Sequence, residues 1–399
     1  MERVVLIIRF MKLAACLAAL FLLWPHQTAF AAQAPGVQAK SAILMTADGQ
    51  TLFEKDADKK LLIASTTKLM TALVCLEQGK LDETVLIKAK HCAVEGSSMY
   101  LKAGERRTVR ELLTGLLLAS GNDAALALAD AVGGSEAGFV HLMNRRAEQL
   151  EMTHTHFANP HGLDAETHYS TARDLAKLMC ACMENADFRA ITSTVTAQIN
   201  GSAYLNHNKL LTRCPGCIGG KTGYTRAAGR CLVSCCERND LRLICVTLHD
   251  PDDWRDHTAL YDWAYAGFQW LNLNEVCRFE VPVLSGSRNK LTVQAEADAR
   301  VLVPTGEKVE LRAELPRFVF APVRRLDVAG SVFVFVQNRE LAVFPLFYRE
   351  GAALAYPVYQ PFAAEEERLW PNDSKSSYPR LASCPAVPRS RPSGKAGYW

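Results

Sequence analysis

The chain has 399 residues, of which 49% are hydrophobic and 22% are charged, and its formal net charge at pH 7 is +3. This is the composition of a globular protein that can bury a large core, and the length allows two domains. The small net charge gives no electrostatic basis for binding nucleic acid. The sequence contains no internal repeat.

Residues 1–32 have the pattern of a secretory signal peptide. Basic residues precede an apolar run from Leu13 to Trp24, and small residues follow up to Ala31 and Ala32, where cleavage is expected. Translation starting at Met11 would also give a complete signal peptide, and a retained membrane anchor is the alternative. No later stretch is long and apolar enough to span a bilayer, so we expect the mature protein to be exported.

The next 240 residues are predicted to have strands at both ends and helices between them. Strands are expected at residues 41–45, 50–54, 195–199, 230–235 and 241–248. Helices are expected at residues 109–118, 124–132 and 138–150, and from an N-cap at Ser170 to about Met183. The turns Ala47-Asp48-Gly49 and Arg238-Asn239-Asp240 join neighbouring strands.

After Trp270 the pattern changes to short strand-like runs separated by turns. These runs lie at residues 276–283, 291–295, 300–303, 308–312 and 332–336. They predict a separate all-β domain at residues 273–350 without a catalytic constellation, which we interpret as a pedestal or interaction module. Residues 351–399 are rich in proline from about Tyr356 onward and are expected to be largely disordered.

The stretch from Ala64 to Met70 places a hydroxyl and an amine three residues apart at the start of a further predicted helix. Positions i and i+3 share one helix face, so Lys68 can lie beside the Ser65 hydroxyl. A buried lysine with a lowered pKa can take the serine proton, and the helix N-terminus offers N–H groups to an oxyanion. Alone, an S-x-x-K pattern is more often an N-cap serine beside a solvated lysine.

Two further motifs change that interpretation. Ser120-Gly121-Asn122 lies between two predicted helices, and Lys221-Thr222-Gly223 follows a turn rich in glycine and cysteine. The order S-x-x-K, S-x-N, K-T-G is the signature of penicillin-binding proteins and serine β-lactamases. The chain resembles the D-alanyl-D-alanine carboxypeptidases among the low-molecular-mass penicillin-binding proteins, over roughly residues 36–350. Segments that also resemble this family are residues 157–163, 206–211 and 219–225.

The resemblance implies an α/β fold. A β-lactamase/transpeptidase-like domain at residues 33–272 would have an antiparallel sheet with helices on both faces and a helical subdomain, and the small all-β domain would follow it. The family's substrates are peptidoglycan pentapeptide stems, β-lactam antibiotics inhibit it covalently, and no cofactor or metal is implied. Its members act outside the cytoplasm, in the cell wall or at the outer face of the cytoplasmic membrane. Many end in a membrane-docking amphipathic helix; this proline-rich tail departs from that pattern, which leaves peripheral membrane contact open.

The resemblance also implies a role for each motif residue. Ser65 would be the nucleophile that attacks the carbonyl of the penultimate D-alanine, and Lys68 would take its proton. Ser120 and Lys221 would relay a proton to the leaving amine. Asn122 would hold Lys68 and accept a hydrogen bond from a substrate amide.

The third motif is expected to bind the substrate. It should lie on an edge strand to which the peptide adds as a further strand, with Gly223 allowing a close approach. The backbone N–H groups of Ser65 and Tyr224 would form the oxyanion hole. The motif lysine and Thr222 would supply part of an anchor for the substrate carboxylate. Arg255 resembles the family's arginine at this distance past K-T-G, and the equal alternative is a surface arginine at the start of a helix.

Two other enzyme classes and one binding class are the alternatives to this interpretation. His161 and His207 have no carboxylate partner in a matching motif, and no G-x-S-x-G surrounds any serine, so both histidines are interpreted as structural. A class A β-lactamase has S-D-N as its second motif and needs a glutamate for deacylation, for which we find no convincing counterpart. The intact motifs disfavour a non-catalytic wall-binding or β-lactam-sensing protein.

Thirteen cysteines are many for an exported protein, and Cys16 lies in the signal peptide. Cys217 and Cys231 could face each other in an antiparallel pair, so a disulfide between them is expected. The alternative is a zinc site built from Cys214, Cys217, Cys235 and Cys236. Adjacent cysteines of a strand point to opposite faces, which disfavours zinc. The cysteines expected to be packing residues are Cys75, Cys180, Cys182 and Cys245.

Overall fold

The computed structural model describes residues 34–78 and 80–355. The predicted signal peptide and the proline-rich tail from Tyr356 lie outside the described residues. Within the described ranges, no helix has the length and apolar character needed to cross a membrane.

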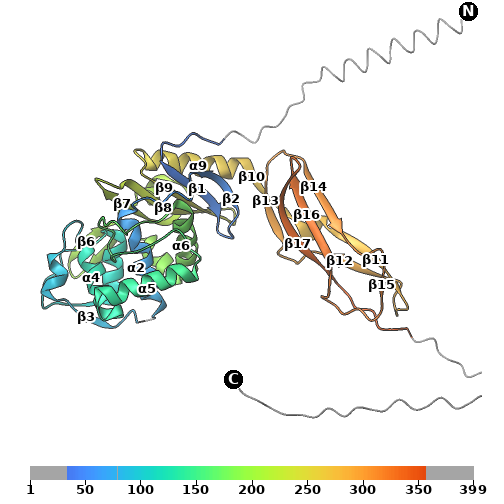
Figure 1. Ribbon diagram of the computed structural model, residues 1–399, viewed down its shortest axis with the longest axis horizontal. Helices are drawn as coiled ribbons and strands as arrows, with labels where there is room; N and C mark the ends of the chain where they lie inside the picture. Colours follow the sequence, from blue (N-terminus) through green and yellow to red (C-terminus); the bar gives the residue numbers. More distant parts are fainter. Residues whose placement is uncertain (1–33, 79, 356–399) are drawn as a thin grey trace, which may run out of the picture.

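A five-stranded antiparallel sheet organises the first region of the molecule (Figure 1). In spatial order its strands are β2 (Thr51–Lys55), β1 (Ser41–Thr46), β9 (Leu241–Leu248), β8 (Gly229–Arg238) and β7 (Cys217–Thr225). The predicted hairpin between β8 and β9 is confirmed: Arg238 pairs with Leu241, and both turn residues between them, Asn239 and Asp240, have positive φ. Positive φ at two successive residues is typical of the tight turns whose twist matches that of a hairpin.

Helices cover both faces of this sheet. On one face, α6 (Ala172–Glu184) packs against β1, β8 and β9, and on the other α9 (Asp253–Gly267) packs against β8 and β9. The central helix α2 (Lys68–Glu77) is buried along nearly its whole length. The helical subdomain around it consists of α3 (Val109–Leu118), α4 (Asn122–Gly133), α5 (Glu136–Gln149) and α7 (Ala186–Thr192). The predicted cap of α6 is wrong by one residue, because the Thr171 hydroxyl accepts the N–H of Asp174.

Several short elements complete the first region. They are the 3-10 turns η1 (Ala64–Thr67) and η2 (Ala89–Ala93), the pair β3 (Thr84–Leu86) and β4 (Arg106–Thr108), the pair β5 (Thr196–Ile199) and β6 (Ser202–Leu205), and α8 (Leu210–Arg213). The predicted strand at residues 195–199 is thus an outlying hairpin strand and not part of the main sheet.

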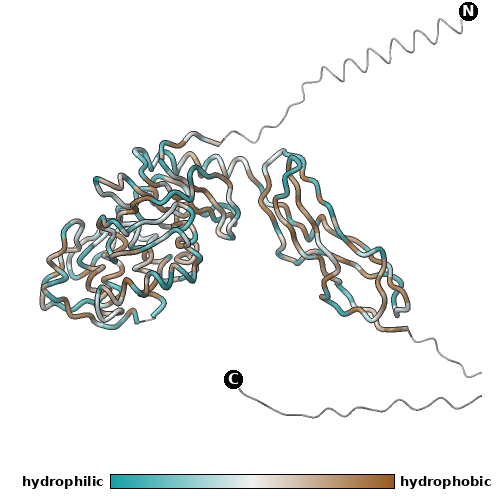
Figure 2. Tube along the Cα trace, in the orientation of Figure 1, coloured by the Kyte–Doolittle hydropathy of each residue, from teal (hydrophilic) through white to brown (hydrophobic). Residues whose placement is uncertain are grey.

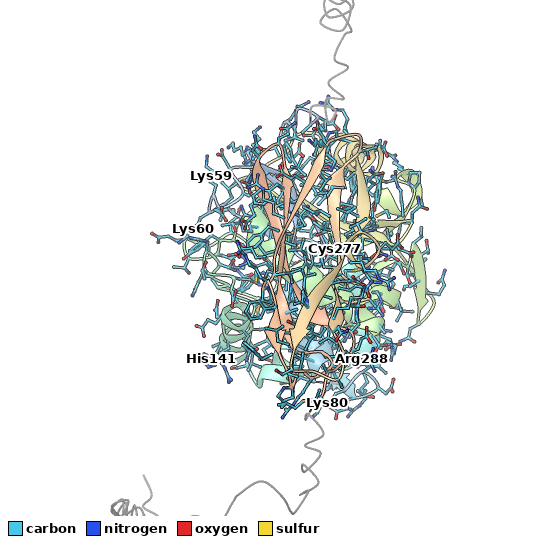
Figure 3. The ribbon with its side chains drawn as sticks, turned by 90° about the vertical axis from the view of Figure 1, so that its right-hand side faces the viewer. Lys59, Lys60, Lys80, His141, Cys277 and Arg288 are labelled. Carbon is cyan, nitrogen blue, oxygen red and sulfur yellow. The ribbon has the colours of Figure 1, made fainter. Side chains whose placement is uncertain are left out.

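The second region is all-β apart from α10 (Leu273–Val276), and Figure 3 looks onto it, with Cys277 near its middle. Its six-stranded sheet has the order β14 (Val309–Glu314), β16 (Val328–Val336), β17 (Arg339–Tyr348), β12 (Lys290–Gln294), β11 (Arg278–Leu284) and β15 (Val319–Phe320). Hydrophobic stretches occur in both regions (Figure 2), and this one has its own buried apolar cluster.

The join between the regions differs from the predicted boundary after residue 272. Strand β10 (Phe268–Asn272) pairs with β13 (Arg300–Pro304), so it belongs with the second region. Leu302 of β13 packs into the core beneath α9, and its backbone exchanges two hydrogen bonds with the side-chain amide of Gln50. At the far end, Ala352 and Leu354 form bridges to residues 323 and 286, so the all-β region extends beyond residue 350.

Candidate active site

Ser65 lies in a tight turn immediately before the central helix. The turn η1 covers Ala64–Thr67, and α2 begins only at Lys68. The sequence placed both residues on one α-helix; the structure separates them by the junction of turn and helix, yet Lys68 Nζ lies 2.8 Å from Ser65 Oγ. The turn opens on a residue with unfavourable backbone geometry, since Ala64 has φ of +46°.

The Lys68 side chain is fully buried and surrounded by hydrogen-bond acceptors. Besides Ser65 Oγ, its Nζ contacts Asn122 Oδ1 at 2.7 Å and the backbone carbonyl oxygen of His161 at 2.6 Å. Burial, reinforced by the nearby Lys221, holds the pKa of Lys68 well below the usual lysine range. A neutral lysine amine can accept the proton of a serine hydroxyl, so the geometry suits general-base chemistry.

The segment from Asn159 to Gly162 supports the nucleophile turn through its backbone. Asn159 Oδ1 accepts the N–H groups of His161 and Gly162, which fixes the shape of the segment. Gly162 has φ of +90°, and a Cβ there would lie 2.0 Å from the carbonyl oxygen of Ala64, so only glycine fits. This close packing brings the His161 carbonyl to Lys68.

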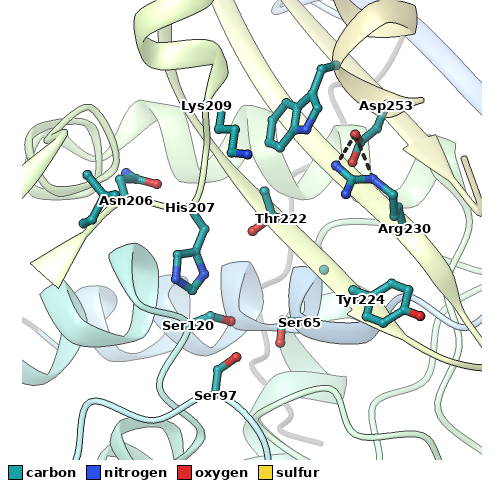
Figure 4. A pocket seen from close by; sticks show the side chains of 13 residues that line it. Ser65, Ser97, Ser120, Asn206, His207, Lys209, Thr222, Tyr224, Arg230 and Asp253 are labelled. Atoms are coloured by element: carbon teal, nitrogen blue, oxygen red, sulfur yellow. Dashed lines mark hydrogen bonds and ion pairs between the residues drawn. The ribbon is translucent and has the colours of Figure 1, made fainter. Parts of the chain in front are cut away.

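The second motif joins α3 to α4 and faces the same space. Ser120 has φ of +61°, and its hydroxyl points toward the cavity (Figure 4). Asn122 is the first residue of α4; its Oδ1 accepts from Lys68, and its Nδ2 donates to the carbonyl of Glu95 at 2.6 Å. Both sides of the amide are therefore engaged within the protein, which favours the role of holding Lys68 over that of binding substrate.

Asp123 is a supporting residue that sequence reasoning missed. Its buried carboxylate accepts the N–H groups of Met99 and Leu101, each at 3.0 Å, and the hydroxyl of Ser98 at 2.6 Å. These bonds hold the loop that carries Ser97 to the cavity. An acidic residue in the first turn of a helix, directly after S-x-N, was the available signal.

Strand β7 carries the third motif and is the last strand of its sheet, as predicted, so no strand pairs with its outer side, where Thr192 Oγ1 bonds both backbone groups of Gly220. Lys221 is buried, its Nζ donates to the carbonyl of Thr222 at 2.9 Å, and burial lowers its pKa to about 7. A Cβ at Gly223 would lie 3.0 Å from the backbone N of Ser65 and from the carbonyl oxygen of Ile63. Glycine thus lets β7 approach the nucleophile turn.

A cavity of about 420 Å³ opens where these elements meet (Figure 4). It is lined by Ser65, Ser97, Ser120, Leu205, Asn206, His207, Lys209, Thr222, Gly223, Tyr224, Arg230, Asp253 and Trp254. Members of all three motifs, namely Ser65, Ser120 and Thr222, therefore open into one space. Lys68 and Lys221 lie beneath its surface, where water does not reach them.

The predicted carboxylate anchor Arg255 does not reach this cavity. Its side chain is 58% exposed and its Nε lies 3.6 Å from Asp256, so the alternative, a surface arginine at the start of α9, is correct. The spacing from the third motif did not predict this position. Helix α9 begins at Asp253, and successive side chains of a helix point in directions about 100° apart, so Asp253 and Trp254 line the cavity while Arg255 does not.

Arg230 and Lys209 are the cations that line the cavity, and sequence reasoning missed both. Arg230 forms an ion pair with Asp253, drawn as dashed lines in Figure 4, and its guanidinium lies 5.4 Å from the centre of the Trp254 ring. It is the cross-strand partner of Tyr224. Pairing β7 with β8 in the sequence would have placed an arginine directly beside the third motif.

The two histidines have different positions. His161 contributes its backbone carbonyl to the site, and burial lowers the pKa of its ring to about 4, which agrees with a structural side chain. His207 lines the cavity near Ser120 (Figure 4), a position that its interpretation as a structural residue did not predict. Burial, followed by the charges of the two site lysines, lowers the pKa of His207 as well.

The expected disulfide between Cys217 and Cys231 is wrong. In the pairing of β7 with β8, Cys217 lies opposite Cys236, and Cys231 lies opposite Gly223. All cysteines of the described ranges are free thiols. Cys235 lies in the core on the opposite face of β8 from Cys236, and no group of three or more ligand side chains in these ranges is arranged to hold a metal ion.

Known proteins share this architecture and sequence. Residues 28–252 match the family described as D-alanyl-D-alanine carboxypeptidase, peptidase S11. DacC of Escherichia coli K12 is 34% identical over 366 residues, which cover 85% of this chain and 91% of that protein. DacF of Bacillus subtilis 168 is 30% identical over 333 residues, covering 78% and 85%. Both are named D-alanyl-D-alanine carboxypeptidases.

Solved structures extend the likeness to three dimensions. Penicillin binding protein 5 from Haemophilus influenzae superimposes with a TM-score of 0.70 at 29% identity, over 80% of this chain and 98% of that one. A mutant of the Streptomyces K15 DD-transpeptidase gives a TM-score of 0.56 at 34% identity, over 58% and 99%. The chain therefore belongs to the D-alanyl-D-alanine carboxypeptidase family.

Proposed function

We propose that this protein is an exported serine-type D-Ala-D-Ala carboxypeptidase that removes the terminal D-alanine from peptidoglycan pentapeptide stems. The observation that carries the proposal is the contact of a buried Lys68 amine with the Ser65 hydroxyl, 2.8 Å apart, at the floor of a cavity bordered by an open strand edge. With the predicted signal peptide, the site of action is outside the cytoplasm, in the cell wall or at the outer face of the cytoplasmic membrane.

Acylation begins when Lys68 takes the Ser65 proton. The serine oxygen attacks the carbonyl carbon of the penultimate D-alanine and forms a tetrahedral oxyanion. The lowered pKa of Lys68 supports this role, because a charged ammonium has no lone pair for the proton. The proton then passes to the amine of the terminal D-alanine by way of Ser120 and Lys221, and the amine leaves. Water hydrolyses the resulting ester and regenerates Ser65.

The substrate lies along β7 as an added strand. Its backbone pairs with the open edge beside Thr222, and Gly223 lets the scissile carbonyl approach Ser65. The N–H groups of Ser65 and Tyr224 stabilise the oxyanion. Removing one such donor costs on the order of 10²–10³-fold in rate in comparable sites.

The terminal carboxylate of the substrate binds at the cationic side of the cavity. Arg230 and Lys209 line it, whereas Arg255 lies outside. Asp253 holds the Arg230 guanidinium in place, and a guanidinium can bind a carboxylate through two parallel hydrogen bonds. Thr222 adds a hydroxyl donor.

The rival functions have less support in this cavity. A class A β-lactamase needs a glutamate that activates the deacylating water, and no glutamate is among the described residues that line the cavity. A non-catalytic β-lactam sensor would keep both Ser65 and a carboxylate anchor, because penicillins also carry a carboxylate, so the release of D-alanine separates it from the enzyme. Arg230 in the cavity suits a ligand with a free carboxylate, a feature that peptide stems and penicillins share.

The nucleophile is tested by Ser65→Ala. We expect it to abolish both covalent labelling by a fluorescent penicillin and release of D-alanine from a pentapeptide, a loss of about 10⁴-fold or more. A penicilloyl adduct on the variant would show that another residue is the nucleophile. In the wild type, labelling without D-alanine release would favour a sensor, and rapid release of hydrolysed penicillin would favour a β-lactamase.

The carboxylate anchor is tested with a matched pair of variants. Arg230→Gln is expected to raise KM for the pentapeptide about tenfold or more, because it removes a charge from the cavity. Arg255→Gln removes an equal charge from the nearby surface and is expected to leave KM unchanged. Equal effects of the two substitutions would contradict the assignment. A pentapeptide ending in a carboxamide should respond little to Arg230→Gln.

A further inference from the structure

Three thiols gather on the sheet face opposite the nucleophile, at the start of the motif strand. Cys214 follows α8, Cys217 is the first residue of β7, and Cys236 on β8 is the cross-strand partner of Cys217. Cys214 Sγ lies 3.7 Å from Cys236 Sγ. Cys214 and Cys236 are buried in the cluster beneath α9, whereas Cys217 is half-buried.

The surroundings favour thiolate formation at Cys214 and Cys217, whereas the hydrogen bonds of Cys236 with these two thiols raise its own pKa. Arg238 places its Nη2 3.6 Å from Cys214 Sγ, and it is held there by the Pro215 carbonyl at 2.8 Å and by Asp262 at 3.0 Å. The hydrogen bond from Cys236, followed by the charge of Arg238, lowers the pKa of the Cys214 thiol. The pKa of Cys217 is lowered too, again first by its hydrogen bond with Cys236.

The other buried thiols of the first region differ in this respect. Burial without a cationic neighbour at hydrogen-bond distance raises the pKa of Cys75, Cys182 and Cys245. Thiols of that kind are unreactive packing groups. The guanidinium beside Cys214 also disfavours the zinc alternative, because a positive charge at the sulfur opposes a dication.

We propose that Cys214 and Cys236 form a disulfide by thiol–disulfide exchange with a disulfide-bearing oxidant, and that the half-buried Cys217 is the first thiol to react. The Cys217 thiolate attacks the oxidant R–S–S–R, so one R–S⁻ leaves and a mixed disulfide forms. Cys236 attacks this mixed disulfide at Cys217 and releases the second R–S⁻. Cys214 then attacks Cys236 Sγ and frees Cys217.

The exchange balances in atoms and electrons. Two protein thiols lose two electrons and two protons, and the oxidant gains them as two R–SH molecules. The distance between Cys214 Sγ and Cys236 Sγ must shorten from 3.7 Å to about 2.0 Å. Gly216, with φ of +79°, and Pro215 separate Cys214 from β7, so a short loop and not a strand makes this adjustment.

The crosslink would tie the loop that precedes the K-T-G strand to β8 and close a chain segment of about 22 residues. Disulfides over loops of this size restrict the unfolded chain and stabilise the fold. Because Lys221 and Gly223 face the nucleophile turn while Cys236 faces α9, the bond forms without touching the reacting atoms. The inference thus goes beyond the proposed peptidase activity and is independent of it.

The test is oxidation of the mature full-length protein with excess oxidised glutathione, followed by non-reducing peptide mapping. We expect a Cys214–Cys236 crosslinked peptide and a mass loss of two hydrogens. Cys214→Ser should eliminate this peptide, whereas Cys245→Ser, a control at a buried thiol on the same side of the sheet that is not one of the three, should keep it. Cys217→Ser should slow its formation at least tenfold while leaving the final yield unchanged.

Labelling by fluorescent penicillin verifies that each variant is folded, so loss of the crosslink is not mistaken for misfolding. Free thiols at both positions after prolonged oxidation, or a different dominant pairing in the wild type, would overturn the proposal. So would one equivalent of tightly bound zinc that protects the three thiols from an alkylating reagent. An unchanged rate in Cys217→Ser would overturn its role as the first reacting thiol.

Discussion

The two regions of this molecule treat polar groups differently. In the first, residues 34–267, many polar and charged side chains are buried, and two lysines, Lys68 and Lys221, are among the largest fully buried side chains. In the second, residues 268–355, no polar or charged residue is buried within the described range. Its core is made of aliphatic and aromatic side chains with Cys277.

This difference indicates that the first region carries the reactive groups and the second region does not. Burying an ionisable group costs free energy unless the group is neutralised or well paired, and that cost is tolerated where a shifted pKa is needed. Lys68 Nζ contacts three hydrogen-bond acceptors, and its lowered pKa lets it give up its proton. The residue can therefore act as a base, while its burial lowers the stability of the folded state. Among its described residues the second region buries no lysine, arginine, histidine, aspartate or glutamate, which is consistent with its interpretation as a pedestal or interaction module.

The largest effect is expected from Lys68→Met, which keeps the bulk of the side chain and removes the base. Penicillin acylation should fall about 10³-fold, since a general base contributes 10²–10⁴. Lys59→Met is the matched control at an exposed lysine (Figure 3) and should acylate like the wild type. Stopped-flow or gel-based labelling rates measure both. Acylation of the Lys68 variant within tenfold of the wild type would mean that another group takes the proton.

Lys221→Met should show by how much the buried lysine lowers the free energy of unfolding. Burial lowers the Lys221 pKa to about 7, so between pH 7 and about 10 the unfolded state binds more protons than the folded state. The lysine therefore destabilises the fold fully below pH 7, and this cost disappears as the pH rises toward 10. We expect the inactive variant to gain roughly 1–4 kcal/mol in urea unfolding at pH 6 and little at pH 10. No gain at pH 6 would contradict this assignment.

A pair of glycine substitutions compares the regions directly. Gly223→Ala puts a Cβ 3.0 Å from the backbone N of Ser65, so acylation should fall roughly 10- to 100-fold through displacement of the nucleophile turn. Gly330→Ala puts a Cβ 2.0 Å from the Glu314 carbonyl oxygen in the second region and should lower stability by about 1–3 kcal/mol without slowing acylation. Thermal melts and labelling rates separate the two effects; slower acylation in the second variant would show coupling between the regions.

The smallest effect on acylation is expected from removing the second region. A chain of residues 34–267, ending before β10, should still be labelled by penicillin within about threefold of the full protein, because every cavity residue lies earlier. It loses the packing of Leu302 and its two bonds to Gln50, so it should be less stable by about 1–3 kcal/mol. A chain ending at residue 272 should be more prone to aggregate, since β10 would lack β13. Loss of labelling in a folded shorter chain would mean that the second region shapes the site.

Much of the site could be predicted because its reactive residues lie in short sequence motifs. Ser65 and Lys68 are close in sequence, and local turn geometry suffices to bring them together. The hairpin of β8 and β9 was equally predictable, since its two-residue turn determines the pairing of the strands.

The errors share a different physical origin. The turn between β7 and β8 pairs Thr225 with Gly229, and this register places Cys231 opposite Gly223, six residues away from Cys217; a bulge between Cys217 and Gly219 then brings Cys217 opposite Cys236. The choice between Arg255 and Arg230 depends on where α9 begins and on which strand lies beside β7. Neither feature leaves a strong periodic signal in the sequence.

By itself, the sequence determined which groups are present for catalysis and in what order, together with the types of most secondary elements, because these depend on residue chemistry and local periodicity. Only the tertiary structure decided that the His161 carbonyl and Asn122 converge on Lys68, that burial lowers the pKa of both site lysines, and that Arg230 lines the cavity. Desolvation and cross-strand neighbourhood arise when segments far apart in the chain pack together, so no single stretch of sequence contains them.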